Sequence, residues 1–138
     1  MIEQVLEFLG NHWMLSSAFL VLLSVFFRYE ASRGGKGINC QEAVNLINHN
    51  DAVVLDVRAA KDFNGGHITD AINISSERLK GNVGELAKYK DRPIILVCAQ
   101  GQTVGAAGQL LRAEGYEKLY RLSGGLAAWQ GEKLPLVN

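Results

Sequence analysis

The sequence is poor in cysteine, and its two cysteines lie far apart. Neither Cys40 nor Cys98 belongs to a Cys-x-x-Cys or Cys/His pattern, which argues against a structural zinc site and against a disulfide framework. A Cys40–Cys98 disulfide stays open, because sequence does not place the two sulfur atoms. The chain also lacks a charge excess: 14 basic and 14 acidic residues give a net charge of zero, without a basic run. Nucleic acid is therefore not an expected partner.

A long stretch without formal charge lies near the beginning of the chain. Between Phe8 and Phe27 the only titratable side chain is that of His12. About 20 apolar residues are enough for a helix to cross a bilayer, and Trp13 and Tyr29 resemble interfacial aromatic anchors. The pattern predicts an amino-terminal transmembrane helix.

Two other interpretations of this segment compete with a membrane anchor. A cleaved signal peptide fits poorly, because Glu3 and Glu7 precede the apolar run without any Lys or Arg, and no small-x-small cleavage site follows it. A buried helix of a soluble protein remains the alternative.

Basic residues near the segment predict its orientation. None precedes it, whereas Arg28, Arg33 and Lys36 follow it, and such residues stay on the cytoplasmic side. We expect residues 1–29 to anchor the chain in the inner membrane as a single pass, with the N-terminus outside. The Gly-rich residues 30–37 are typical of a flexible linker, and residues 38–138 would form a cytoplasmic domain, in a reducing compartment.

The central pattern of that domain runs from Pro93 to Glu114. The continuous apolar run Ile94–Val97 predicts a strand buried on both faces of a parallel sheet. Cys98 would lie at its carboxyl end, where open α/β sheets bind ligands. Apolar positions at helical spacing then predict a helix that follows residue 103 and ends at Gly115.

Cys98 is a candidate nucleophile if its thiolate is stabilised. A free thiol has a pKa of about 8.5, and lowering that pKa by two units requires about 2.7 kcal/mol. A helix terminus typically supplies about 0.3 to 1 kcal/mol, so backbone N–H groups of a tight loop would have to supply the rest. Gly101 permits the positive φ that such a loop needs. The alternative is that Cys98 is a small buried hydrophobic residue.

Two further segments are predicted around this centre. Asn39 and Glu42 form a capping signal for a helix in whose first turn Cys40 lies, and we interpret Cys40 as structural. The run Ala52–Asp56 predicts a second buried strand. Beyond it, Arg58 could bind an anionic sulfur donor or pair with the Asp56 carboxylate.

Three motifs together resemble the rhodanese family: DVRAAKDFNGGHITDAINI from Asp56, CAQGQT from Cys98, and LSGGLAAWQGEKLP from Leu122. They occur in the family's order and cover nearly all of residues 38–138. The resemblance implies an α/β three-layer fold with a mainly parallel sheet flanked by helices. It also implies a sulfurtransferase without cofactor or metal, which takes sulfur from a small sulfur-containing anion or a persulfide and passes it to a thiol or cyanide.

The resemblance also assigns roles to residues. Cys98 would carry the persulfide, and His67 and Trp129 would be scaffold and core. Substrate would contact Arg58 and the active-site loop, which consists of Ala99, Gln100, Gly101, Gln102 and Thr103.

The sequence of the active-site loop also bears on two other functions. A cysteine phosphatase would have Arg at the sixth position after the cysteine, where this chain has Val104. The loop is electrically neutral, whereas relatives that use thiosulfate often carry a cation there, so a persulfide donor fits better. A membrane-tethered interaction or redox-sensing module without turnover stays open as the alternative.

Overall fold

The computed structural model describes the backbone of residues 1–101 and 104–138, and the side chains of these ranges except those of residues 30–33. The chain divides into two compact units, residues 1–32 and 33–138, which are taken in turn below.

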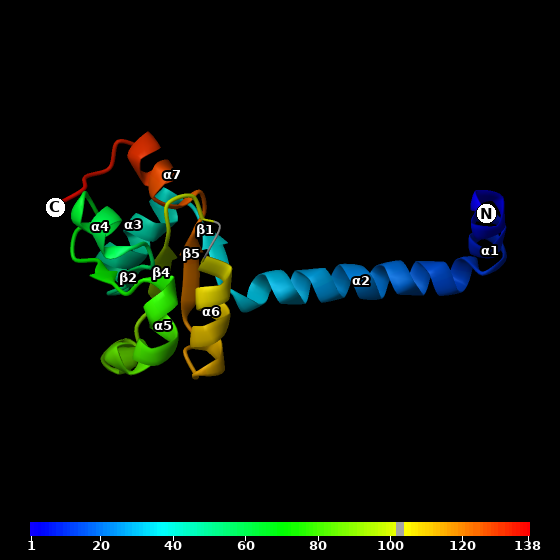
Figure 1. Cartoon of the computed structure of the whole chain (residues 1–138), viewed down its shortest axis with the longest axis horizontal. Helices are drawn as coiled ribbons and strands as arrows, with labels where there is room; N and C mark the ends of the chain where they lie inside the picture. The colour runs from blue at the N-terminus through cyan, green and yellow to red at the C-terminus, as the bar shows by residue number, and fades with distance from the viewer. Residues whose placement is uncertain (102–103) are drawn as a thin grey trace. The chain divides into compact units, whose positions relative to one another are not determined.

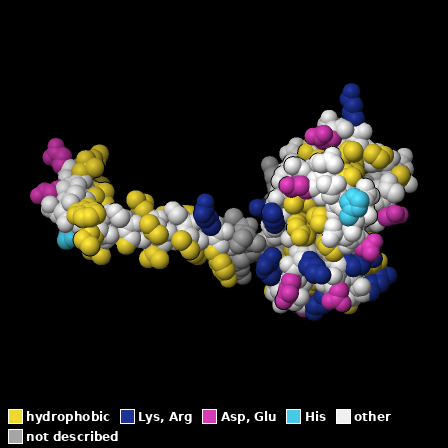
Figure 2. Space-filling view, turned by 180° about the vertical axis from the view of Figure 1, so that it is seen from behind, with side chains coloured by type: hydrophobic (Ala, Val, Ile, Leu, Met, Phe, Trp, Pro, Cys, Tyr) yellow, Lys and Arg dark blue, Asp and Glu magenta, His cyan; other side chains and the backbone are white. Residues whose placement is uncertain are grey.

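The first unit consists of α1 (Ile2–Asn11) and α2 (Trp13–Arg33), and its large apolar side chains are exposed (Figure 2). The charge-free stretch from Phe8 to Phe27 does not form one continuous helix, because the backbone of His12 leaves the helical region at φ −121° and ψ 43°. Within the described residues no helix is by itself long and apolar enough to cross a membrane. Ile2–Asn11 and Trp13–Tyr29 meet the length and composition requirement only as a pair bent by 94°.

The second unit is a three-layer α/β domain around a five-stranded sheet (Figure 1). Every strand pairs with its neighbours in parallel, in the order β1-β5-β4-β2-β3. The strands are β1 (Lys36–Ile38), β2 (Val53–Asp56), β3 (Ile72–Asn73), β4 (Ile94–Val97) and β5 (Leu119–Leu122). β4 is central and fully buried, so the prediction of a two-face-buried strand is confirmed, as is the strand predicted at residues 52–56.

Helices cover both faces of the sheet and form two apolar cores. One core packs side chains of α5 (Ser76–Asn82), the 3-10 helix η1 (Val83–Tyr89) and α6 (Val104–Ala113). The other packs side chains of α3 (Cys40–His49) and α7 (Gly125–Gly131). The predicted capping box opens α3, since Asn39 and Glu42 each accept the other's backbone N–H. The short α4 (Ala60–Asn64) follows β2.

The predicted flexible linker over residues 30–37 is wrong, because α2 continues to Arg33 and β1 already begins at Lys36. Lys36 and Gly37 belong to β1 and pair with Tyr120 and Arg121 of β5. Gly34 is buried against α6, where a Cβ on Gly34 would lie 2.9 Å from the Gly105 Cα. The glycines of this segment therefore serve a close backbone approach, which composition alone does not distinguish from flexibility.

Candidate active site

The sheet places Cys98 directly after the last residue of β4, at the carboxyl edge. The side chain is 4% exposed and packs in the same core as Val104 and Ala107 of α6. Cys40 lies in the other core, and neither cysteine forms a disulfide. The Cys40–Cys98 pair that the sequence left open is therefore absent.

The active-site loop directs a backbone donor at the Cys98 sulfur. Gly101 has φ +83° and donates its N–H to Sγ at 2.8 Å. A hydrogen bond from a backbone N–H favours an anionic sulfur over a neutral one. Ala99 and Gln100 are exposed at the mouth of the loop. The other two predicted loop residues, Gln102 and Thr103, lie outside the described residues.

Gly124 and Gly125, at the start of α7, pack against the backbone of the active-site loop. The N–H groups of Leu126 and Ala127 donate to the carbonyls of Cys98 and Ala99, at 2.8 and 3.0 Å. Gly125 has φ +59°, and a Cβ there would overlap the Cys98 carbonyl and lie 2.7 Å from the Gly101 nitrogen. Gly124 and Gly125 thus allow the loop to sit directly on the start of α7. The sequence signal for this role is the Gly-Gly pair in the motif that begins at Leu122.

Arg58 is bound to Asp56. Asp56 is 1% exposed, and its carboxylate accepts from Arg58 Nε at 3.0 Å and from Nη2 at 2.8 Å. Nη2 also donates to the Gly66 carbonyl at 2.8 Å. This geometry favours the structural pairing over the substrate contact that the sequence also allowed, because most of the guanidinium fork is occupied.

Asn73 is a supporting residue that sequence reasoning missed. Its side-chain amide donates to the carbonyls of Asp56 and Arg58, at 3.0 and 2.9 Å. These bonds fix the turn that follows β2 and hence the Arg58 side chain. No local signal marks this role, since Asn73 acts on residues well before it in the chain.

His67 is scaffold. Its ring stacks on Phe63 with centroids 3.7 Å apart, and Nδ1 lies 2.8 Å from the Phe63 carbonyl. Its backbone pairs with Val137. These contacts hold the ring against Phe63 and the backbone against the C-terminal segment, which is the scaffold role that the resemblance implied.

Cys40 is a poor nucleophile for a physical reason. Burial, and to a smaller extent the charge of Glu132, raise the pKa of the Cys40 thiol. A raised pKa leaves less thiolate at neutral pH, which is the reactive form. A backbone hydrogen bond at Cys40 acts in the opposite direction but is the smallest of the three effects, so the pKa of this thiol stays raised.

A cavity of about 390 Å³ opens beside the nucleophile's loop. It is bounded by the segment after β2, by Ala99 and by α7; its lining consists of Arg58, Lys61, Asp62, Gly65, Gly66, Ala99, Leu126 and Gln130. The size is in the range of small-molecule sites. Of the residues that sequence analysis assigned to substrate, this cavity brings together Arg58 and Ala99.

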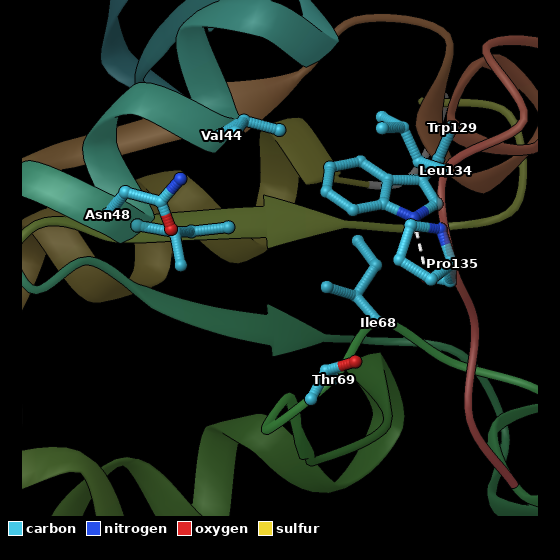
Figure 3. A pocket seen from close by; sticks show the side chains of 8 residues that line it. Val44, Asn48, Ile68, Thr69, Trp129, Leu134 and Pro135 are labelled. Atoms are coloured by element: carbon cyan, nitrogen blue, oxygen red, sulfur yellow. Dashed lines mark hydrogen bonds between the residues drawn. The ribbon is translucent and has the colours of Figure 1, made fainter.

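A second, more apolar cavity of about 220 Å³ lies between α3 and the C-terminal segment (Figure 3). Trp129 forms part of its wall, but its indole is 4% exposed and donates Nε1–H to the Pro135 carbonyl at 3.1 Å. Trp129 is therefore a core residue, as predicted. Among the described residues, no three His, Cys, Asp or Glu side chains gather as a metal site would require.

Comparison with known proteins agrees with this architecture. The model of the Rhodanese-like domain matches residues 39–132. Over 99% of its length the chain is 39% identical to the uncharacterized protein YibN of Escherichia coli, of which it covers 98%. It is 32% identical to the thiosulfate sulfurtransferase GlpE of Shewanella oneidensis, over 68% of this chain and 91% of GlpE. A rhodanese-related protein from Thermoplasma volcanium superimposes with a TM-score of 0.63 at 26% identity, over 74% of this chain and 97% of that one.

Proposed function

The chain belongs to the rhodanese-like domain family, and we propose that it is a sulfurtransferase that carries sulfane sulfur as a persulfide on Cys98. The donor is thiosulfate or a persulfide, and the acceptor is a thiol or cyanide. The observation that carries this proposal is the Gly101 N–H held 2.8 Å from Cys98 Sγ at the carboxyl edge of the sheet. The curated relative GlpE, named as a thiosulfate sulfurtransferase, supports the reaction class.

The loop geometry fits persulfide chemistry because the reaction needs a stabilised sulfur anion, and the Gly101 N–H points at Cys98 Sγ. Backbone N–H donors stabilise the thiolate before the transfer and the terminal persulfide sulfur after it. Exchange at sulfur depends on the thiolate fraction and on access, without a charge relay. Ala99 and Gln100 bring no cation to the mouth of the loop. We therefore expect a persulfide to be a better donor than the thiosulfate dianion.

The proposal is tested by sulfur loading of the full-length protein. The protein is incubated with thiosulfate or with a low-molecular-weight persulfide, and its intact mass is measured before and after treatment with a reductant. We expect the gain of one sulfur atom, lost on reduction and mapped to the peptide that contains Cys98. A folded protein that gains no sulfur from any donor would contradict the proposal and favour the interaction module.

We also propose that residues 1–29 anchor the protein in the inner membrane, with the rhodanese-like domain in the cytoplasm. The support is the charge-free run from Phe8 to Phe27 and the basic Arg28 and Arg33 that follow it. A reporter enzyme that works only in the cytoplasm should be active when it is fused after Asn138, and one that works only after export should be inactive. The protein should also fractionate with membranes. A fusion active only as an export reporter would contradict the orientation.

A further inference from the structure

The cavity beside Ala99 holds both signs of charge close to the nucleophile. Lys61 and Asp62 are exposed on α4, and both line the cavity together with Gln130 of α7. Ala99, on the same wall, is the residue next to Cys98. A molecule bound here would therefore lie at the mouth of the active-site loop.

The charge of the cavity is balanced, which bears on what it binds. Arg58 also lines it, but its guanidinium is neutralised by the Asp56 carboxylate 2.8 Å away. Within the described residues, no ion pair of Lys61 or Asp62 occupies either side chain. One ammonium, one carboxylate and one amide then remain for a ligand, a set that complements a zwitterion. An inorganic dianion would meet Lys61 but would also face the repulsion of Asp62.

We propose that this cavity binds the amino-acid part of a cysteine-type persulfide: Lys61 pairs with the ligand's carboxylate, Asp62 with its ammonium group, and Gln130 supplies a neutral hydrogen-bonding group. This inference rests on the proposed function, since it names the donor class of that same site. The cavity volume of about 390 Å³ accommodates an amino acid or a small peptide of this kind.

The transfer balances without an oxidant or reductant. The Cys98 thiolate attacks the outer sulfur of R–S–SH. A bond forms between Cys98 Sγ and that outer sulfur, and the S–S bond of the donor breaks. The electron pair leaves on the inner sulfur as R–S⁻, the proton stays on the transferred sulfur, and the enzyme holds Cys98–S–SH.

The roles of Lys61 and Asp62 are tested with three persulfide donors, two of which each lack one charged group of the first. They are the persulfides of cysteine, of N-acetylcysteine, which lacks the ammonium group, and of cysteamine, which lacks the carboxylate. Rates of sulfur loading at subsaturating donor give kcat/KM for the full-length protein and for Lys61→Gln and Asp62→Asn. Lys80→Gln, an exposed lysine on α5, is the matched control.

We expect kcat/KM of the wild type to be about fivefold higher for cysteine persulfide than for each of the other two donors. This factor corresponds to the interaction energy of one exposed ion pair. Asp62→Asn should erase the preference over the N-acetyl donor, and Lys61→Gln the preference over the cysteamine donor. Lys80→Gln should keep both. Equal donor preferences in all four proteins would overturn the inference while leaving the persulfide carrier intact. Absence of loading from every donor would instead overturn the proposed function.

Discussion

Replacing Cys98 by serine should abolish sulfur loading and leave the fold in place. The oxygen of serine can accept the Gly101 N–H that the sulfur accepts at 2.8 Å, and the side chain stays small enough for a site that is 4% exposed. A hydroxyl is not ionised at neutral pH and does not form a persulfide, so the chemistry is lost with little change in packing. Intact mass after incubation with donor, together with thermal unfolding, measures both properties.

Cys40→Ala is the matched control for this experiment. Burial raises the pKa of the Cys40 thiol, so this cysteine contributes little thiolate, and alanine is well tolerated in a helix. We expect the variant to gain one sulfur atom as the wild type does. Loading that survives in Cys98→Ser and disappears in Cys40→Ala would mean that the carrier is assigned to the wrong cysteine.

The parts of the fold that sequence predicted are those in which the cause is local. Ile94–Val97 is a continuous apolar run because a central parallel strand is buried on both faces. The Asn39–Glu42 capping box depends on residues three apart. Cys98 could be placed at the sheet edge because it directly follows such a strand. In each case the pattern and its structural consequence lie within one element.

The parts that sequence did not predict depend on partners elsewhere in the chain. Gly34 is buried because α6 approaches its backbone, yet its Gly-rich surroundings have the composition of a linker. His12 interrupts the apolar run through its backbone dihedral angles, which hydropathy does not register. The cavity beside Ala99 lies between α4 and α7, and only the folded chain brings Lys61 and Gln130 to the same cavity.

Replacing Gly125 by alanine should destabilise the domain and slow sulfur loading together. At φ +59° any L-residue is strained, at a cost of about 1 to 2 kcal/mol. The added Cβ would also overlap the Cys98 carbonyl and lie 2.9 Å from the Ala99 carbonyl carbon, and overpacking of this kind costs about 1 to 3 kcal/mol. Together these costs are about 2 to 5 kcal/mol, and each kcal/mol lowers Tm by about 4 to 8 °C in a domain of this size.

The effect on activity has a separate cause, because the displaced atoms belong to the active-site loop. A Cβ at residue 125 would lie 2.7 Å from the Gly101 nitrogen, so the loop has to move and its N–H no longer points at Cys98 Sγ. Loading rates measured well below Tm therefore isolate the loss of the donor from the loss of stability. Gly131→Ala, in the last residue of α7 with no atom within 4 Å of the new Cβ, is the control and should keep both wild-type properties. A Gly125→Ala protein as stable and as fast as Gly131→Ala would show that the start of α7 does not set the geometry of the loop.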